Sequence, residues 1–450
     1  YSIRAPSLPG KTVCHLRSKA VSTYFVLSIM ESAQAYSCPR QTKTVKTHKT
    51  LDTMNIIDWI LYIPLALCVC YLLLYAIASK FYRAPQYPEA RMLRRIAVLF
   101  PAYKEDRVIL ASVESFLKQD YPKELYDVIV ISDQMRPETN EALQALPIRL
   151  LTANYTESSK AKAMTLAMDS IDTDAYDIVV IMDADNMTTP DFLSTINRVF
   201  DSGIKSAQAH RTGKNLNTDI SVLDSISEEI NNGFFRSGHN AVGLSAGLSG
   251  SGMAFEAKWF HQQVKYLWTA GEDKELEAML LQQRIYTVYL PDLLVFDEKT
   301  QKKEAISNQR KRWIAAQFGA LRTSLPHLPK ALLQGNIDYC NKIFQWMLPP
   351  RLVQLAGVFG LTFVFTVTGI ILSLYNGGHE WMIAIKWWIL SAAQVAAMTL
   401  PISGDKLFTK QVGKAILKVP MLAVTMIGNL FKLKGANKKF IHTEHGEHHK

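Results

Sequence analysis

The sequence contains little cysteine: five residues among 450, with no C-x-x-C pair. Structural zinc sites need closely spaced pairs, and disulfide frameworks need an even set, so the sequence predicts neither. This usage suits a protein whose thiols stay reduced in the cytoplasm. The cysteines are Cys14, Cys38, Cys68, Cys70 and Cys340.

The net positive charge is also small outside the first fifty residues. The formal net charge is +10, but residues 1–50 contain eight Lys and Arg against one acid and so account for +7 of it. Nucleic-acid-binding domains usually carry a basic stripe with interleaved aromatic residues. The rest of the chain has no such stripe, so we expect no nucleic-acid partner.

The first 53 residues lack hydrophobic periodicity and are rich in Ser, Thr and Lys. The chain begins with Tyr1, and Met54 stands just before the first long apolar run. We therefore expect natural translation to start at Met54 and residues 1–53 to be a disordered or non-native extension. The alternative is a targeting segment, because residues 20–30 resemble the apolar core of a signal peptide.

Three long apolar runs are present, at residues 59–78, 352–375 and 381–402. Each is about long enough to cross a bilayer. Basic residues follow the first and the third run. If residues 1–53 are not part of the natural protein, the positive-inside rule places the region between the first two runs in the cytoplasm; if they are, their eight Lys and Arg favour the opposite orientation. The sequence thus predicts an integral protein of the plasma or inner membrane.

A shorter apolar run near the C-terminus contains Pro420, and this favours an interfacial or re-entrant helix over a full membrane crossing. With this helix, the predicted organisation has six parts. The expected parts are an extension (1–53), transmembrane helix 1 (54–80), a cytoplasmic domain (94–330), transmembrane helices 2 and 3 (350–403), the interfacial or re-entrant helix (414–432) and a basic, histidine-containing cytoplasmic tail (433–450).

The cytoplasmic domain alternates between strand and helix patterns. Strands are expected at residues 96–101, 128–132, 148–151, 178–182 and 204–209, and helices at 108–118, 160–171 and 191–201. Alternation of this kind predicts an α/β fold with a mostly parallel sheet covered by helices on both faces.

One predicted strand runs directly into two carboxylates, Asp183 and Asp185. The carboxyl end of a buried strand opens onto the crevice where α/β proteins bind ligands. Two close carboxylates repel each other unless a cation lies between them, and a divalent cation holding a diphosphate fits this pattern. The alternative is that Asp185 or Asn186 caps the helix that begins near Pro190.

Further polar segments follow other strands or lie downstream. They are residues 100–106, 131–133 (Ile-Ser-Asp), 158–163, 250–255, 271–273 (Gly-Glu-Asp) and 309–313 (Gln-Arg-Lys-Arg-Trp). With the Asp-Ala-Asp triplet they resemble the membrane-embedded family-2 glycosyltransferases, which include cellulose, chitin, hyaluronan and poly-N-acetylglucosamine synthases. The resemblance covers roughly residues 96–313 and the apolar runs on both sides, and it implies a GT-A-like domain inserted between transmembrane helices.

Two segments depart from the family pattern. Gly271 stands where the family's Thr-Glu-Asp motif has threonine, and Gln134-Met135-Arg136 replaces an acidic-Gly-Ser continuation. The first departure keeps both carboxylates, whereas the second weakens any detailed assignment of donor contacts.

The resemblance implies a role for each segment. It implies inverting transfer of a sugar from a UDP-sugar to a glycan hydroxyl, giving β-linked polysaccharide, with Asp273 as the general base and Glu272 beside it. It further implies Mg²⁺ or Mn²⁺ at Asp183 and Asp185; donor contacts from Ala102, Glu105, Asp133, Lys162, Asp183 and Arg312; and acceptor contacts from Gly252, Gln309 and Trp313.

Several alternatives stay open at this point. Lys160 and Lys162 are equally compatible with a solvated helix face, and acids such as Glu272 and Asp273 are favoured at any helix N-terminus. Three spans are few for a polymer channel, so an export or accessory subunit could complete one. The competing functions are a non-processive transferase that glycosylates a lipid, and a catalytically silent membrane scaffold subunit.

Overall fold

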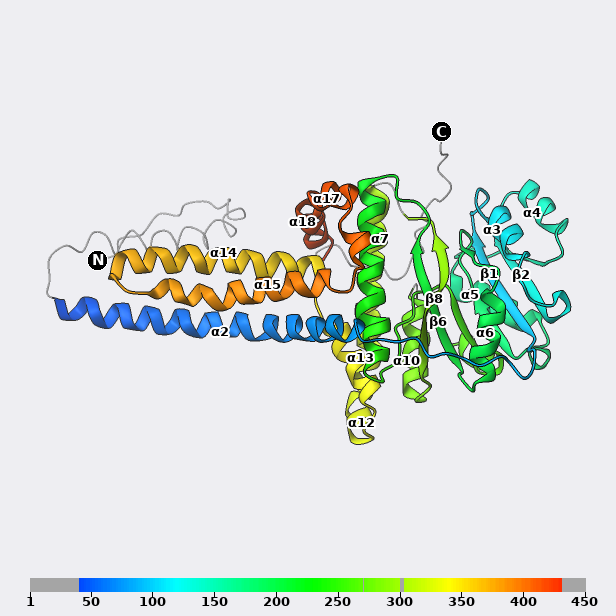
Figure 1. Cartoon of the computed structure of the whole chain (residues 1–450), viewed down its shortest axis with the longest axis horizontal. Helices are drawn as coiled ribbons and strands as arrows, with labels where there is room; N and C mark the ends of the chain where they lie inside the picture. The colour runs from blue at the N-terminus through cyan, green and yellow to red at the C-terminus, as the bar shows by residue number, and fades with distance from the viewer. Residues whose placement is uncertain (1–39, 270, 300–302, 431–450) are drawn as a thin grey trace, which may run out of the picture. The chain divides into compact units, whose positions relative to one another are not determined.

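The computed structural model describes residues 40–269, 271–299 and 303–430. The chain divides into two compact units, Tyr1–Pro64 and Leu65–Lys450. Helix α2 (Arg40–Ser79) begins in the first unit and ends in the second. The second unit contains an eight-stranded sheet, its covering helices and a group of apolar helices (Figure 1).

The sheet has the strand order β3-β2-β1-β4-β7-β6-β8-β5. Neighbours pair in parallel from β3 to β4 and between β6 and β8, whereas β7 and β5 run antiparallel to their neighbours. The predicted α/β class with a mostly parallel sheet is therefore confirmed. The strands are β1 (Ile96–Tyr103), β2 (Tyr126–Asp133), β3 (Arg149–Ala153), β4 (Ile178–Ile181), β5 (Met187–Thr188), β6 (Ser206–Gly213), β7 (Met253–Glu256) and β8 (Thr287–Asp297).

Helices cover both faces of this sheet and continue beyond it. Around the sheet lie α3 (Ile109–Phe116), α4 (Pro137–Gln144), α5 (Lys160–Ser170), α6 (Phe192–Asp201), α7 (Asp219–Asn232), α8 (Gly238–Ala241), α9 (Ala257–Val264) and α10 (Glu272–Gln282), with a π-helical turn η3 (Gly233–Ser237) between α7 and α8. The C-terminal part has α11 (Lys303–Ser324), α12 (Leu328–Leu333), α13 (Ile337–Met347), α14 (Arg351–Asn376), α15 (Ile385–Thr399), α16 (Gly404–Leu407), α17 (Lys410–Ile416) and α18 (Val419–Leu430).

The sheet is buried on both faces because its central strands are continuous apolar runs. In β4, Ile178 and Val180 belong to one hydrophobic cluster, while Val179 and Ile181 belong to another on the opposite face. Such alternation follows from the two-residue period of a strand. The first cluster includes side chains of α3 and α6, and the second those of α5, α9 and α10. This packing fixes where each parallel strand ends.

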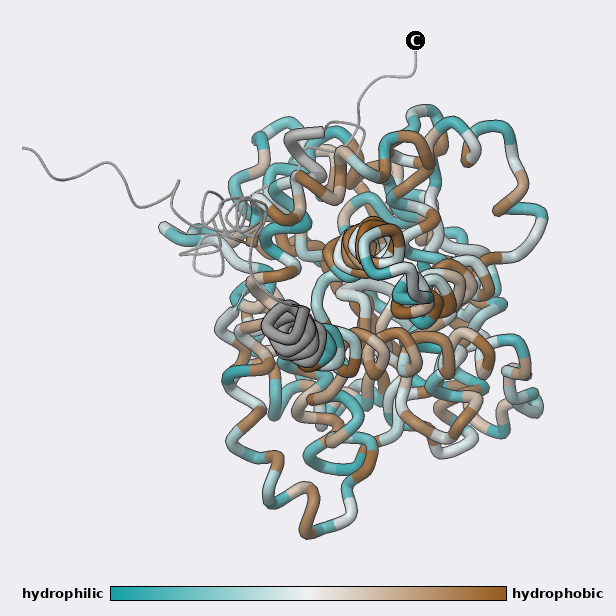
Figure 2. Tube along the Cα trace, turned by 90° about the vertical axis from the view of Figure 1, so that its left-hand side faces the viewer, coloured by the Kyte–Doolittle hydropathy of each residue, from teal (hydrophilic) through white to brown (hydrophobic). Residues whose placement is uncertain are grey.

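Among the residues that the structure describes, three helices are long and apolar enough to cross a membrane: Met54–Ser79, Arg351–Asn376 and Glu380–Thr399. The pair α17 and α18, bent by 47°, would be a fourth candidate if it formed one broken span. The predicted apolar runs thus coincide with candidate spans, and the run containing Pro420 lies in the bent pair. Figure 2, which looks along α14 and α15, shows how hydrophobic these helices are.

Helices α14 and α15 pack side by side through polar as well as aromatic contacts (Figure 1). Gln354 accepts no hydrogen bond at its Oε1 but donates from Nε2 to Gln394 Oε1 at 2.9 Å, and the hydroxyls of Thr362 and Ser391 lie 2.8 Å apart. Interhelical hydrogen bonds of this kind are common between helices in lipid, where an unpaired polar group is costly.

Candidate functional site

Three parallel strands end at one edge of the sheet. Strand β1 ends at Tyr103, which pairs with Asp133 at the end of β2, and Leu99 pairs with Ile181 at the end of β4. Asp183 follows Ile181 by two residues. The carboxyl ends of these strands therefore bring Asp133 and Asp183 to the same crevice, as expected for an α/β sheet.

A cleft of about 240 Å³ opens at this edge, and we call it the donor cleft. Several separate parts of the chain line it: the strand ends and Arg211 of β6, the start of α5, the loop of Ser249 and Gly250, the start of α10 with the residues before it, and one face of α11. Ten of the twelve residues predicted from the sequence lie in its lining: Ala102, Glu105, Asp133, Asp183, Asp185, Glu272, Asp273, Gln309, Arg312 and Trp313.

Asp133 is the most buried acid among the strand-end residues of the cleft. Its side chain is 2% exposed, and its Oδ1 atom has no hydrogen-bond partner. Burial raises the pKa of this carboxyl, although Ser158 and two nearby lysines act in the opposite direction. An unpaired buried oxygen is costly unless a ligand donates to it, so Asp133 fits an acceptor for an N–H or O–H group of a ligand.

Asp185 is held by the chain around it. Its Oδ1 accepts from Asn186 Nδ2 at 3.1 Å, and its Oδ2 accepts from the backbone N–H of Glu298 at 2.7 Å. Each carboxylate oxygen can accept more than one bond, so both retain lone pairs for a further ligand.

Asp183 forms an ion pair with Lys160, the first residue of α5. The Lys160 ammonium also lies 3.6 Å from Glu272 and donates to the carbonyl of Gly250 at 2.7 Å. Burial alone would lower the pKa of Lys160, but Asp183 and Glu272 keep it above its ordinary value. A positive charge is thus favoured strongly at this position between two carboxylates.

The two aspartates fit a divalent cation that arrives with a nucleotide. Within the described residues no group of three His, Cys, Asp or Glu side chains could hold a metal ion by itself. Magnesium and similar hard cations commonly take one or two carboxylates and complete their shell with substrate phosphates and water. The carboxylates of Asp183 and Asp185, both lining the cleft, match that donor set.

Glu272 and Asp273 begin helix α10, which presents them to the cleft. Asp273 Oδ1 accepts from the backbone N–H of Lys274 at 2.9 Å, and Oδ2 lies 3.4 Å from the Lys274 ammonium. Burial raises the pKa of Glu272 to about 7; Lys160 opposes this shift, and Asp273 and Asp183 reinforce it. The two acids thus differ in their cationic partner: Asp273 contacts Lys274, the next residue of its own helix, whereas Glu272 lies near Lys160.

Helix α11 brings Gln309, Arg312 and Trp313 to the same cleft. Positions 309, 312 and 313 lie on one helical face because residues three and four apart are neighbours on a helix. The indole of Trp313 remains 38% exposed, so it offers a flat face to a ligand.

A glycine sets the distance between α10 and α11. The residue before α10, Gly271, lies so close to α11 that an added Cβ would stand 2.6 Å from Ala316 Cβ. No other side chain fits there without movement, which explains why this chain has glycine at the first position of its Gly-Glu-Asp segment. Glu272 and Asp273, which follow Gly271, line the cleft together with Arg312 and Trp313 of α11.

Two predicted site residues lie outside the cleft lining. Lys162 donates to the carbonyl of Glu157 at 2.7 Å and lies over the ring of Tyr155. Gly252 adopts a φ of +61°, and a Cβ there would approach Val295 Cγ2 to 2.9 Å.

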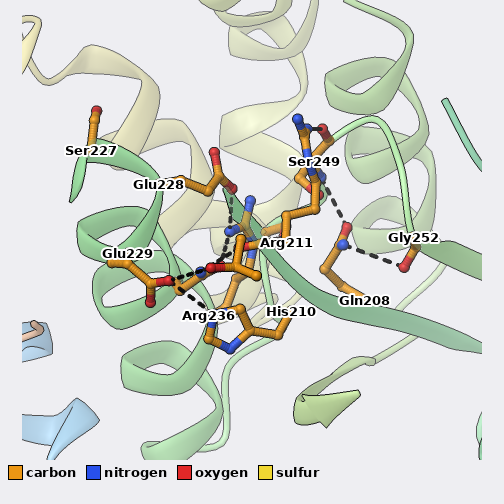
Figure 3. A network of polar contacts seen from close by, with 12 residues as sticks. Gln208, His210, Arg211, Ser227, Glu228, Glu229, Arg236, Ser249 and Gly252 are labelled. Carbon is orange, nitrogen blue, oxygen red and sulfur yellow. Dashed lines mark hydrogen bonds and ion pairs between the residues drawn. The ribbon is translucent and has the colours of Figure 1, made fainter. Parts of the chain in front are cut away.

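A polar network holds the loop that contains Gly252, as Figure 3 shows. Gln208 accepts from the backbone N–H of Ser249 at 2.9 Å and donates to the carbonyl of Gly252 at 3.3 Å. Arg211 donates to the carbonyl of Ser249 and forms an ion pair with Asp297. The loop between α8 and β7 is therefore anchored on β6, next to the cleft.

Lys160 and Arg211 are cleft residues that sequence reasoning did not assign. The resemblance implies a donor contact for Lys162, but the structure places Lys160, two residues earlier in the same segment, in the cleft instead. Arg211 had no signal in the sequence, because it stands beyond a predicted strand end with no recognisable motif.

The Gly271 contact gives a first prediction. Gly271→Ala should lower the unfolding free energy by about 1–3 kcal/mol and reduce activity, because the new methyl group pushes α10 away from α11. Ala316→Gly removes the opposing methyl group, so the double variant should recover most of both losses. Thermal midpoints and initial rates of the three variants check this; equal damage in the single and double variants would contradict the contact.

The raised pKa of Glu272 gives a second prediction. Between pH 4.5 and 7 the folded protein binds the Glu272 proton more tightly than the unfolded chain does, so stability should fall as pH rises through this window. The loss amounts to roughly 3 kcal/mol. Glu272→Gln should remove this slope from the pH dependence of the thermal midpoint, whereas Glu157→Gln, at an exposed position, should keep it. An identical slope in wild type and Glu272→Gln would exclude the effect.

Comparison with known protein families gives a match for the central region. Residues 94–316 match the model of a family described as "Glycosyltransferase like family 2". No curated protein matches the sequence.

Solved structures with a similar fold include the mannosyltransferase PcManGT from Pyrobaculum calidifontis, in complex with GDP-Man and Mn²⁺. It is 17% identical with a TM-score of 0.50, over 76% of this chain and 97% of the mannosyltransferase. This likeness shows the fold alone.

Two other matched structures are less similar. Glucosyl-3-phosphoglycerate synthase from Mycobacterium tuberculosis, with Mn²⁺, UDP and glucosyl-3-phosphoglycerate, is 15% identical with a TM-score of 0.37, over 53% of this chain and 87% of the synthase. S. aureus TarS (residues 1–349) with UDP-GlcNAc is 12% identical with a TM-score of 0.36, over 51% of this chain and 66% of that one.

Proposed function

We propose that the family-2 glycosyltransferase domain formed by residues 94–316 transfers a sugar from a UDP-sugar to an acceptor hydroxyl, with inversion at the anomeric carbon. One observation carries this proposal. Segments far apart in the chain meet at the donor cleft, and they supply a buried acid with an unpaired oxygen, a carboxylate pair, a candidate base and an arginine beside a tryptophan.

We assign the donor end of the cleft to the strand termini. Asp133 would accept a hydrogen bond from the uracil ring, with Ala102 and Glu105 at the rim of the nucleotide site. Asp183 and Asp185 would hold Mg²⁺ or Mn²⁺, and the cation would supply positive charge to the diphosphate when bound.

We assign Asp273 as the general base. An acceptor hydroxyl is a poor nucleophile, so its proton must pass to a carboxylate as the oxygen attacks the anomeric carbon. A bond forms between this oxygen and the anomeric carbon, the bond from that carbon to the diphosphate breaks, and UDP leaves with the electron pair. Attack opposite the leaving group converts an α-linked donor into a β-linked product.

Cations of the chain would stabilise the departing diphosphate. Negative charge grows on the leaving oxygens as the bond breaks, and fixed cations lower the barrier most when they meet charge that is still developing. Arg312 can contact two oxygens at once through its planar guanidinium group. We add Lys160 to this role, since its ammonium group already lies between Asp183 and Glu272 in the cleft.

Two products are compatible with this chemistry. We propose β-linked polysaccharide formation, with Gln309 and Trp313 holding the acceptor sugar. Transfer of a single sugar to a lipid hydroxyl is the second candidate, and it is favoured by a second cavity that leads from Asp273 toward the candidate membrane spans.

Purified protein incubated with a panel of UDP-sugars and Mn²⁺ tests the proposal. We expect UDP release with one or a few of these donors. A radiolabelled donor then distinguishes a ladder of glycans from one sugar per lipid. If no UDP-sugar gives UDP release and the protein does not bind UDP, the proposed function is refuted, together with the assignments of the carboxylates.

A further inference from the structure

A second cavity of about 270 Å³ adjoins the donor cleft. Asp273, Lys274 and Trp313 line both spaces. The second cavity extends from them to Leu352 and Gln354 in the first turn of α14 and to Met426 of α18. It therefore connects the candidate base with the start of the candidate membrane span Arg351–Asn376.

The second cavity contains positive charge that its own acids do not balance. Of its arginines, Arg236 is paired with Glu228 at 2.8 Å, and its Nε donates to the carbonyl of Gly247. Arg310 and Arg351 differ: among the residues that the structure describes, no carboxylate forms an ion pair with either of them. Two guanidinium groups thus face one cavity without counter-charges in contact.

Arg351 has an unused donor in this cavity. Its Nη2 donates to the carbonyl and hydroxyl oxygens of Ser227, at 3.2 and 3.0 Å, and its guanidinium carbon lies 5.9 Å from the centre of the Phe234 ring. Its Nη1 is buried and has no hydrogen-bond partner. A buried cationic donor without a partner costs free energy that a bound anion would recover.

Arg310 is almost fully buried, with 8% of its surface exposed. Burial lowers the pKa of Arg310, and the buried carboxyl of Asp224 only partly offsets this effect. Arg310 stands two residues before Arg312, so one helix supplies an arginine to each of the two spaces. An anion in the second cavity would thus meet Arg310 while the donor diphosphate met Arg312.

We propose that the second cavity binds an acceptor lipid whose headgroup carries a phosphate, held by Arg310 and Arg351, with a headgroup hydroxyl directed to Asp273. Guanidinium groups match phosphate oxygens in charge and in bidentate geometry. Leu72, Leu352 and Met426 give the cavity an apolar side for the lipid chain. A neutral glycan would leave both arginines without counter-charges. This proposal rests on the proposed function, in which Asp273 takes the hydroxyl proton.

Binding of farnesyl phosphate to the detergent-solubilised full chain tests this proposal, with farnesol as the neutral analogue of equal chain length. The protein is first saturated with UDP and Mn²⁺, so that the donor cleft is filled. We expect farnesyl phosphate to bind at least about tenfold more tightly than either farnesol or inorganic phosphate, because charge and chain both contribute. The Arg310→Gln, Arg351→Gln double variant should lose at least about tenfold in affinity for farnesyl phosphate.

Arg322→Gln provides the matched control, since Arg322 lies on the same helix as Arg310 but is exposed. It should bind farnesyl phosphate like wild type. Unchanged UDP affinity and thermal midpoint show that the double variant is folded. If it does not fold, two other measurements take its place: the affinity of Arg310→Gln alone for farnesyl phosphate, and the decrease in the affinity of the wild type for farnesyl phosphate between 50 and 500 mM NaCl. Equal binding of farnesol, equal binding of inorganic phosphate, or no effect of the arginine variants would overturn the proposal.

The UDP titration separates the two proposals. If UDP does not bind in the presence of Mn²⁺, the proposed function fails. If UDP binds and farnesyl phosphate does not, only the acceptor assignment fails, and a neutral glycan becomes the better occupant of the second cavity.

Discussion

Asp273→Asn is expected to lower kcat by about 10²–10⁴-fold, the contribution typical of a positioned general base. The amide cannot accept the proton of the acceptor hydroxyl, but it can still accept the hydrogen bond from the Lys274 N–H. The affinity for UDP should therefore stay within about threefold of wild type, because Asp133 and the carboxylate pair are untouched. Initial transfer rates and a UDP titration on the same preparation measure both quantities.

Asp292→Asn is the matched control for this variant, because Asp292 is an exposed aspartate of β8. It should leave kcat and UDP affinity unchanged. A fall in UDP affinity that accompanies the loss of kcat in Asp273→Asn would assign Asp273 to donor binding instead of proton transfer.

Asp183→Asn is expected to lower kcat/KM by roughly 10²–10³-fold, because a cation that binds poorly no longer brings a preorganised positive charge to the developing oxyanion. The amide oxygen preserves an acceptor for Lys160 but removes the negative charge that a divalent cation requires. In wild type, EDTA should weaken UDP binding, and added Mn²⁺ should restore it. In the variant, the affinity for UDP should be low and nearly independent of Mn²⁺.

Asp191→Asn controls for the loss of a nearby acid, because Asp191 is exposed at the start of α6 and makes no capping hydrogen bond. It should retain the Mn²⁺ dependence of wild type. UDP binding that is insensitive to EDTA in wild type would remove the basis for a metal role of Asp183.

The parallel part of the fold could be predicted because its strands are unambiguous. β4 is an unbroken apolar run that is followed closely by Asp183 and Asp185, and a run of this kind is stable only when both faces are covered. The carboxyl ends of such strands share one edge of the sheet, so the sequence alone is enough to expect Asp133 and Asp183 near each other, as the structure shows.

Strands β7 and β8 could not be predicted in the same way. β8 contains Pro291, and a proline within a run argues against a central strand. The structure accommodates it at a register shift, where Ala209 pairs with Leu290 but His210 pairs with Leu294. β7 is four residues long and follows a glycine-rich turn, so it showed no periodicity.

The choice between Lys160 and Lys162 shows a different limit. Residues two apart lie about 200° apart around a helix, so only one of these lysines can face the cleft. The rotation of α5 is fixed by the burial of Ala161, Ala163 and Met164 against the sheet. This packing depends on the tertiary structure, so the rotation of α5 cannot be predicted from the spacing of the two lysines alone.

The lysine bridge between Asp183 and Glu272 has a consequence for the order of binding. A divalent cation arriving alone would compete with a tethered ammonium group for Asp183, whereas a diphosphate gives that ammonium group a new anionic partner. Each ligand should consequently strengthen the binding of the other by the same factor, because such coupling is reciprocal. We therefore expect the protein without a nucleotide to bind a free divalent cation only weakly, and to bind the cation well once a nucleotide diphosphate is present.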